Sequence, residues 1–301
     1  IVGLLYSLKG GLQVSLRTDV FQMAVFLVIF SIAFIYMIFG SDFSFNSILQ
    51  STGVHEQAAR PGYVLIYVAL LQVFSYPAHD PVMMDRGFIA NQNKTNYSFI
   101  LAFLLSTFCI FGFGMFGIQA GLIGYAYENQ LLGTWQNMFG PGVYFLLICS
   151  LLVSAMSTLD SALASSARLV IDEFYIFKRS IKNGRIAMST FMAFGLLFTL
   201  FPSQSLFDAV AVTGTASMFL TPVMIVTFLG GKIPIWAYTI TWFFSMIGAF
   251  AYIFRDIETI TYLLPGLHKY DQLLSICLYI IVFGFCICFI GALSNRFLAK
   301  A

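Results

Sequence analysis

Long apolar runs separated by short polar segments dominate the chain. A helix needs about 20 residues to cross a bilayer, and eight of these runs are near that length or longer. They cover residues 18–40, 61–80, 97–124, 141–177, 186–201, 204–229, 233–253 and 271–295. Residues 1–8 predict the end of a preceding helix, and residues 8–17 (LKGGLQVSLR) predict the loop that follows. Strand alternation and linker composition are missing. The pattern therefore predicts one all-α transmembrane domain over residues 1–301, N-terminally truncated, with about eight transmembrane helices.

Composition places the chain among integral membrane proteins. Of its 301 residues, 59% are hydrophobic and only 9% are charged. The net charge of +2 is spread over short loops, so we expect the lipid bilayer as a partner and no nucleic acid. The five cysteines lie inside apolar runs, without the spacing of metal ligands or of a disulfide framework.

Basic residues in the short loops predict the orientation of the helices. With residues 9–17 in the cytoplasm and alternating crossings, the inner side holds Lys9, Arg17, Arg86, Lys94, Lys178, Arg179, Lys182, Arg185, Lys232, Arg296 and Lys300, and the outer side holds Arg60, Arg255 and Lys269. This bias predicts eight crossings of the cell membrane and a cytoplasmic C-terminus. Arg168 falls near the inner end of the fourth segment, from which its side chain reaches the interface by snorkelling.

The fourth segment changes midway from a lipid-compatible run to one rich in Ser, Thr and Ala. At about 100° per residue, one helical stripe carries Ser154, Ser157, Thr158, Ser161 and Ser165. Asp160 lies in the same turn, and a carboxylate at this depth is costly unless it faces a cavity or a partner. Hydroxyl and carboxylate oxygens are the hard ligands that a small alkali cation prefers, so the stripe predicts half of a sodium site. The alternative is close helix packing through small residues.

Two segments are interrupted by helix-breaking residues. Residues 75–81 (SYPAHDP) place prolines on both sides of a His-Asp pair, and residues 212–217 (VTGTAS) precede Pro222 by about one turn. Non-helical backbone at membrane depth persists where it is buried or lines a cavity, and in transporters it marks binding sites. The alternative is a simple kink. The candidate substrate or gate residues at these interruptions are Tyr76, His79, Asp80, Thr213 and Thr215.

Three stretches, in order and correctly spaced, resemble the sodium:solute symporter family, which includes the sodium/glucose, sodium/proline and sodium/sialic acid carriers. Residues 10–22 (GGLQVSLRTDVFQ) are similar to the family's Gly-Gly-Leu loop and the T-D-x-x-Q helix start that follows. Residues 76–90 (YPAHDPVMMDRGFIA) stand in the place of its unwound helix. Residues 156–175 (MSTLDSALASSARLVIDEFY) resemble its M-S-T/S-L-x-S-x-L-x-S motif.

The resemblance implies the second half of a five-plus-five inverted-repeat transporter fold. The first six predicted segments correspond to core helices five to ten, and the last two are peripheral helices. The family's main sodium site matches the carbonyl of Ser154 and the hydroxyls of Ser157 and Thr158. Its other ligands are backbone carbonyls of the first core helix, which is upstream of this chain in the family.

A second sodium site, present in some members of the family, corresponds to Asp19, Asp160 and Ser161. Asp160 stands where those members have Ser, which predicts a stronger site, a protonated carboxyl or a structural pair. Asp19 has an alternative role: with Gln22 it resembles a capping box at the start of a helix.

The residues near the first interruption depart from the family. Tyr76 matches the tyrosine that closes over substrate in sugar carriers, and its ring either stacks on a sugar or packs. Asp80-Pro81 stands where relatives often have Asn-Gln or Asp-Gln, and Asp85-Arg86 stands where they have Gln-Arg. His79 and Asp80 either recognise a substrate hydroxyl or carboxylate, titrate near neutral pH, or form a satisfied polar pair.

These observations predict a carrier, not an enzyme: sodium-coupled symport of a sugar, amino acid or organic anion by alternating access. We expect Na⁺ as the coupling ion and no other cofactor. Proton coupling through Asp160 or His79 is one alternative. The other is a transporter-like sensory module of a signalling receptor, followed by a cytoplasmic domain.

Overall fold

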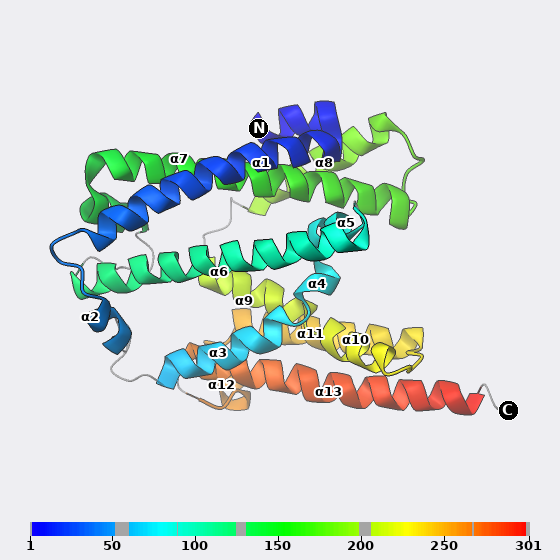
Figure 1. Ribbon diagram of the computed structural model, residues 1–301. Coiled ribbons are helices and arrows are strands. Elements are labelled where there is room, and N and C mark those ends of the chain that lie inside the picture. Colours follow the sequence, from blue (N-terminus) through cyan, green and yellow to red (C-terminus); the bar gives the residue numbers. More distant parts are fainter. Residues whose placement is uncertain are drawn as a thin grey trace. The chain divides into compact units, whose positions relative to one another are not determined.

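The computed structural model describes residues 2–51, 60–88, 90–124, 131–198, 206–266 and 268–298, and every regular element within them is a helix (Figure 1). The helices form two compact units, residues 1–54 with 81–203 and residues 55–80 with 204–301. The chain passes from the second unit to the first at Asp80–Pro81, inside the interrupted segment predicted at 61–80.

The first unit is built around two long helices, α1 and α7, that pack along each other (Figure 1). Its elements are α1 (Val2–Ile38), α2 (Phe45–Gln50), α5 (Pro81–Gly87), α6 (Gln92–Leu122), α7 (Leu131–Arg168), the π-helical turn η1 (Leu169–Glu173) and α8 (Ile181–Phe198). α7 bends at Gly140, where φ is 67° and Pro141 follows. Only glycine adopts such a φ without a steric cost, so the bend is encoded locally.

An aromatic cluster joins α1 and α6 in the core of the first unit. Phe30 is fully buried, and its ring centroid lies 5.0–5.8 Å from those of Phe34, Phe108, Phe113 and Phe116. Offset and edge-to-face ring pairs at such distances are favourable beyond the area they bury. Gly112 allows this approach, because a Cβ at that position would overlap Phe30 Cζ.

Gly112→Ala is expected to lower the free energy of unfolding by about 1–3 kcal/mol, because an added methyl group in a packed core forces neighbouring rings off their rotamers. Phe30 cannot yield easily, since it is enclosed by rings. The measurement is denaturant unfolding of the purified protein in detergent. Gly114→Ala is the matched control, because a Cβ there meets nothing within 4 Å. Equal stabilities of the two variants would contradict the packing argument.

The second unit centres on α11 and α13, with α3, α9 and α10 packed against them. Its elements are α3 (Arg60–Val73), α4 (Tyr76–His79), α9 (Leu206–Ser217), α10 (Leu220–Phe228), α11 (Ile235–Ile253), α12 (Glu258–Leu263) and α13 (Lys269–Leu298). Its apolar core contains Val68, Met218, Leu273 and Ile280, each at most 2% exposed.

Seven helical spans among the described residues are long and apolar enough to cross a membrane. They are Leu16–Ile38, Pro61–His79, Gln92–Leu122, Leu131–Glu173, Phe207–Phe228, Ile235–Ile253 and Lys269–Asn295. Each corresponds to one predicted segment. The remaining predicted segment, 186–201, overlaps α8, which is not among these spans. The first turns of α8 carry Lys182 and Arg185. Residues 199–201 lie outside the described part. The protein is thus an all-α, multi-pass membrane protein.

The loop predicted at residues 8–17 is wrong, because α1 runs through it from Val2 to Ile38. Residues 2–8 therefore belong to this same helix and do not end a preceding one. A glycine within a helix costs about 1 kcal/mol relative to alanine, which is why Gly10-Gly11 favoured a loop. Tertiary packing offsets that cost: Leu4 and Leu8 pack against a buried cluster that includes Leu163 of α7.

Candidate cation site

Asp19 lies in the interior of α1 in the first unit. The capping-box interpretation of Asp19 and Gln22 is therefore wrong, since α1 begins at Val2 and offers no unpaired N–H groups at Asp19. The side chain instead faces α7, the helix that packs along α1. This position leaves the carboxylate available for a polar contact between two membrane-length helices.

Each carboxylate oxygen of Asp19 accepts a hydrogen bond from a hydroxyl of the serine stripe. Ser157 donates to Oδ1 at 2.5 Å, and Ser161 donates to Oδ2 at 3.1 Å. The two serines are four residues apart, so they lie one above the other on the same face of α7. Hydrogen bonds to an ionised acceptor are stronger than neutral ones. The stripe therefore contributes polar contacts to a carboxylate, beyond the close packing that small residues allow.

Asp160 is fully buried beside this contact. Its exposed fraction is 0%, and that of Ser161 is 3%. Thr18 of α1 donates to Asp160 Oδ2 at 3.4 Å. One carboxylate from each helix thus lies at the α1–α7 contact, and each accepts hydrogen bonds from hydroxyls of the opposite helix.

The remaining members of the stripe form a second oxygen pair. Thr158 is exposed, and its hydroxyl donates to the carbonyl oxygen of Ser154 at 3.1 Å. Ser157 stands between Ser154 and Thr158 in the sequence, but its hydroxyl donates to Asp19. The structure therefore groups Ser157 with Asp19 and Ser161, whereas the sequence placed it with Ser154 and Thr158. Ser165, on the same stripe, is 1% exposed and its hydroxyl has no hydrogen-bond partner among the described residues.

The donor set of the α1–α7 contact suits a hard cation. It offers carboxylate and hydroxyl oxygens, which suit alkali and alkaline-earth ions better than the softer transition metals. No group of three or more His, Cys, Asp or Glu side chains that could hold a metal occurs in the described part of the chain.

The first interruption, in the second unit, contains the one-turn helix α4, and a buried serine with hydrogen bonds precedes it. Ser75, fully buried, contacts the Gln72 carbonyl at 3.0 Å and the Ser217 hydroxyl at 3.3 Å. The ring of Tyr76 is 47% exposed and meets the His79 ring edge-on at 5.1 Å. His79 Nδ1 lies 3.2 Å from the Ser75 carbonyl, and the Tyr76 side chain interacts with Asp80.

The second interruption lies at residues 218–219, between α9 and α10; residues 212–217, where it was predicted, are the last turns of α9. Thr215 is fully buried, where Gln72 Nε2 donates to its hydroxyl at 2.9 Å and the hydroxyl donates to the Ala211 carbonyl at 2.7 Å. Ser245 of α11 donates to the carbonyls of residues 215 and 216 at 2.6 and 3.1 Å. These bonds satisfy groups that the break would leave unpaired. Thr213 is exposed and bonds only to carbonyls of its own helix among the described residues.

Two contacts between charged side chains were not predicted from the sequence. Arg168 contacts Asp85 at 2.7 Å and Asp172 at 3.8 Å, and 46% of its side chain is exposed. In the second unit, Asp208 accepts from the Tyr252 hydroxyl at 2.8 Å and pairs with Arg255 at 3.4 Å. The acid in the first turn of an apolar run was the available signal for the second contact, because an intramembrane charge predicts a partner.

Fold and contacts thus define the chain as a polytopic helical membrane protein with carboxylate–hydroxyl contacts between membrane-length helices. Comparisons with protein-family models, with curated proteins and with solved structures find no match to the chain.

Proposed function

We propose that this chain is the second half of a sodium-coupled symporter that carries a small organic solute by alternating access. The observation that supports it best is the Asp19 carboxylate, which accepts hydroxyls from Ser157 and Ser161 across the α1–α7 contact. A packing stripe alone does not need a carboxylate, and burying one is costly unless it serves a partner.

Sodium would take its ligands from oxygens already gathered at this contact. The hydroxyl hydrogens of Ser157 and Ser161 rotate away, and their lone pairs with the Asp19 carboxylate face the ion. The Ser154 carbonyl and the Thr158 hydroxyl, one turn apart on α7, supply the second ion position. Each sodium ion that enters contributes about 2.3 kcal/mol per 100 mV, which corresponds to about 50-fold accumulation of solute at that potential.

The resemblance to sodium:solute symporters supplies the proposed architecture. α1 is core helix five, α3 to α5 form the broken helix six, and α6, α7 and α8 are helices seven to nine. α9 and α10 together form helix ten, and α11 and α13 are peripheral. This is the second half of a five-plus-five inverted repeat.

Substrate recognition is proposed for the first interruption. Tyr76 offers an exposed aromatic face beside His79 and Asp80, which together suit a hydroxyl-bearing or carboxylate-bearing solute. Thr213 is an exposed hydroxyl for the same role. Thr215 is better assigned to holding the α9–α10 break, because its hydroxyl is buried and satisfied.

A cell-membrane location with a cytoplasmic C-terminus requires that α8 also crosses the bilayer. α8 has 18 residues, and its basic side chains lie in the first turns. They lie at the end of α8 that the bias of basic residues places at the inner interface.

Proton coupling is a second candidate, favoured by the complete burial of Asp160. It predicts uptake that is independent of sodium and lost in Asp160→Asn. Sodium-dependent uptake that survives this substitution would exclude it.

Ser157→Ala and Thr158→Ala in the full-length protein are each expected to weaken sodium binding about tenfold or more, since an oxygen partner of a charged group contributes about 1.5–3 kcal/mol. Binding of radiolabelled sodium to purified protein measures this without knowledge of the substrate. Uptake of a panel of labelled sugars, amino acids and organic anions then tests transport. Ser150→Ala is the matched control, because its buried hydroxyl donates only to the Leu147 carbonyl within the described part. Unchanged sodium affinity in a folded Ser157→Ala protein would overturn the assignment.

A further inference from the structure

A groove of about 790 Å³ runs along the outer face of α8 in the first unit. One end is basic, with Lys182 and Arg185, and the remainder is mostly apolar. The sequence had assigned these two cations to a cytoplasmic loop and nothing more, and the proposed transport cycle does not use them.

The basic end is held in place by the start of the helix. The Ser180 hydroxyl accepts from the backbone N–H of Asn183 at 3.2 Å, which caps α8. Arg185 Nε donates to the Leu8 carbonyl at 2.8 Å, which holds the guanidinium in place, and its terminal nitrogens bond to no residue that the structure describes. Lys182 is exposed and makes no ion pair with any residue that the structure describes.

Among the described residues that line the groove, none is acidic and could neutralise this charge. The two nearest acids in sequence, Asp172 and Glu173, are not among its described lining residues, and Asp172 is already paired with Arg179 at 3.1 Å and with Arg168. A ligand with a negative head is therefore the complement of the basic end.

The apolar part of the groove has the length of one lipid chain in one leaflet. Ile186, Ala193 and Leu197 follow one face of α8, and Leu197 is 53% exposed. From Ile186 to Leu197 the helix rises about 16 Å at 1.5 Å per residue. Half of the about 30 Å hydrocarbon core is about 15 Å. With α8 crossing the bilayer as proposed above, a chain seated here would begin at the interface, beside the cations, and end near the midplane.

We propose that this groove binds an anionic phospholipid, with its phosphate on Lys182 and Arg185 and one acyl chain along α8. Basic pockets beside transmembrane helices recognise anionic lipid head groups, and this one joins such a pocket to an apolar track. Ser189 and Thr190, which also line the groove, lie next to the basic turn, where glycerol and ester oxygens would pass.

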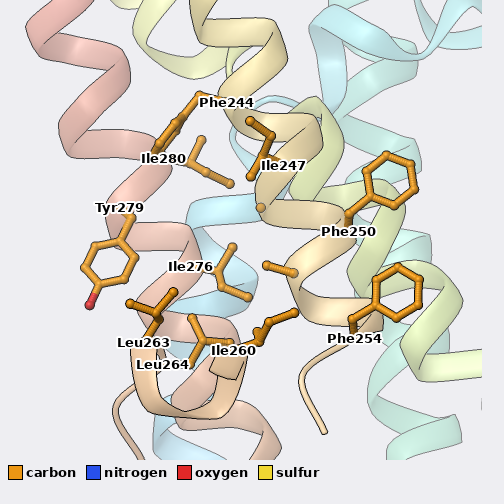
Figure 2. Close-up of a pocket in the computed structure, with 12 residues that line it drawn as sticks. Phe244, Ile247, Phe250, Phe254, Ile260, Leu263, Leu264, Ile276, Tyr279 and Ile280 are labelled. Carbon is orange, nitrogen blue, oxygen red and sulfur yellow. The ribbon is translucent and has the colours of Figure 1, made fainter. Parts of the chain in front are cut away.

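A second groove in the protein provides an internal comparison. It lies in the second unit, has a volume of about 640 Å³ and is lined by side chains of α11, α12 and α13 (Figure 2). Its lining residues, such as Ile247, Ile276 and Ile280, are apolar or aromatic and none is charged. The acyl chains of a lipid with any head group would fill it, so it is the matched control for head-group selection.

The test uses the full-length protein in nanodiscs of phosphatidylcholine, titrated with phosphatidylglycerol and read by thermal stabilisation and by native mass spectrometry of retained lipid. Wild type is expected to prefer phosphatidylglycerol. Lys182→Gln/Arg185→Gln is expected to raise the half-saturating concentration about 25-fold, about fivefold for each cation near the interface. Lys182→Gln alone, which removes no contact to a described residue, keeps the test valid if the double variant does not fold.

Matched variants separate the head group from the tail. Ala193→Phe fills the α8 groove and is expected to abolish the preference, whereas Ala251→Phe in the second groove leaves it unchanged. A photo-crosslinker at position 193 is expected to capture lipid. The proposal is overturned if the basic variants keep wild-type lipid preference, if inorganic phosphate stabilises as strongly as phosphatidylglycerol, or if position 193 crosslinks to protein.

Discussion

Asp19→Asn is expected to remove sodium binding from the physiological range, with a loss of affinity of about 1,000-fold. At an effective dielectric constant of about 20, a unit charge at 4 Å contributes about 4 kcal/mol, and the substitution removes that charge. Asn keeps the shape of the side chain and one acceptor oxygen, so the contacts of Ser157 or Ser161 with α1 are preserved in part. The measurement is equilibrium binding of labelled sodium together with sodium-dependent uptake.

Asp172→Asn is the control for this prediction, because it removes a carboxylate of the same chain that pairs with Arg179 at the end of α7. It should leave sodium affinity unchanged. If a folded Asp19→Asn protein binds sodium like the wild type, the carboxylate only holds α1 against α7, and the symport proposal loses its main support.

Asp208→Ala is expected to lower the free energy of unfolding by about 3–5 kcal/mol, the largest stability effect that we expect for a single substitution. Asp208 is 7% exposed, and it bridges the Tyr252 hydroxyl and Arg255. The guanidinium also lies 4.4 Å above the Tyr252 ring and is only 14% exposed. Removing one partner of a buried pair leaves the other charge uncompensated. Denaturant unfolding in detergent measures the loss.

Two companion variants identify the cause of that loss. Tyr252→Phe removes one hydrogen bond to a charged group and should cost about 1.5–3 kcal/mol. Asp208→Ala/Arg255→Met removes both charges and should recover part of the stability that the single variant loses, because a buried pair replaced by apolar groups is often neutral. If the double variant is less stable than Asp208→Ala, the unpaired charge is not what destabilises the protein.

The α1–α7 contact combines the mechanical and the chemical roles proposed here. Without an ion, Ser157 and Ser161 join the helices through Asp19. With an ion, the same three side chains would become its ligands, so binding exchanges a protein–protein contact for a protein–ion contact. A carrier needs such an exchange, because a coupling ion acts only through a difference in its contacts between two states.

The amino-acid sequence by itself determined most of the membrane-length helices and the break at residues 75–81. Backbone groups in hydrocarbon must be paired within the segment, so an apolar run of membrane length forms a helix wherever it occurs. Pro77 and Pro81 interrupt the helix locally, since proline lacks the N–H that a helix needs. The stripe of Ser157 and Ser161 likewise follows from spacing alone. These features depend on a few neighbouring residues, and the structure places the seven membrane-length spans and the first break where the sequence predicted them.

Only the tertiary structure decided which polar groups meet. Ser157 bonds to Asp19, 138 residues away, and Asp208 pairs with Arg255 over 47 residues. The same packing keeps residues 8–17 helical in spite of two glycines. Periodicity fixes the face on which a side chain lies but not the helix opposite that face. That choice depends on how whole surfaces fit together, which is a property of the packed chain and not of any local pattern.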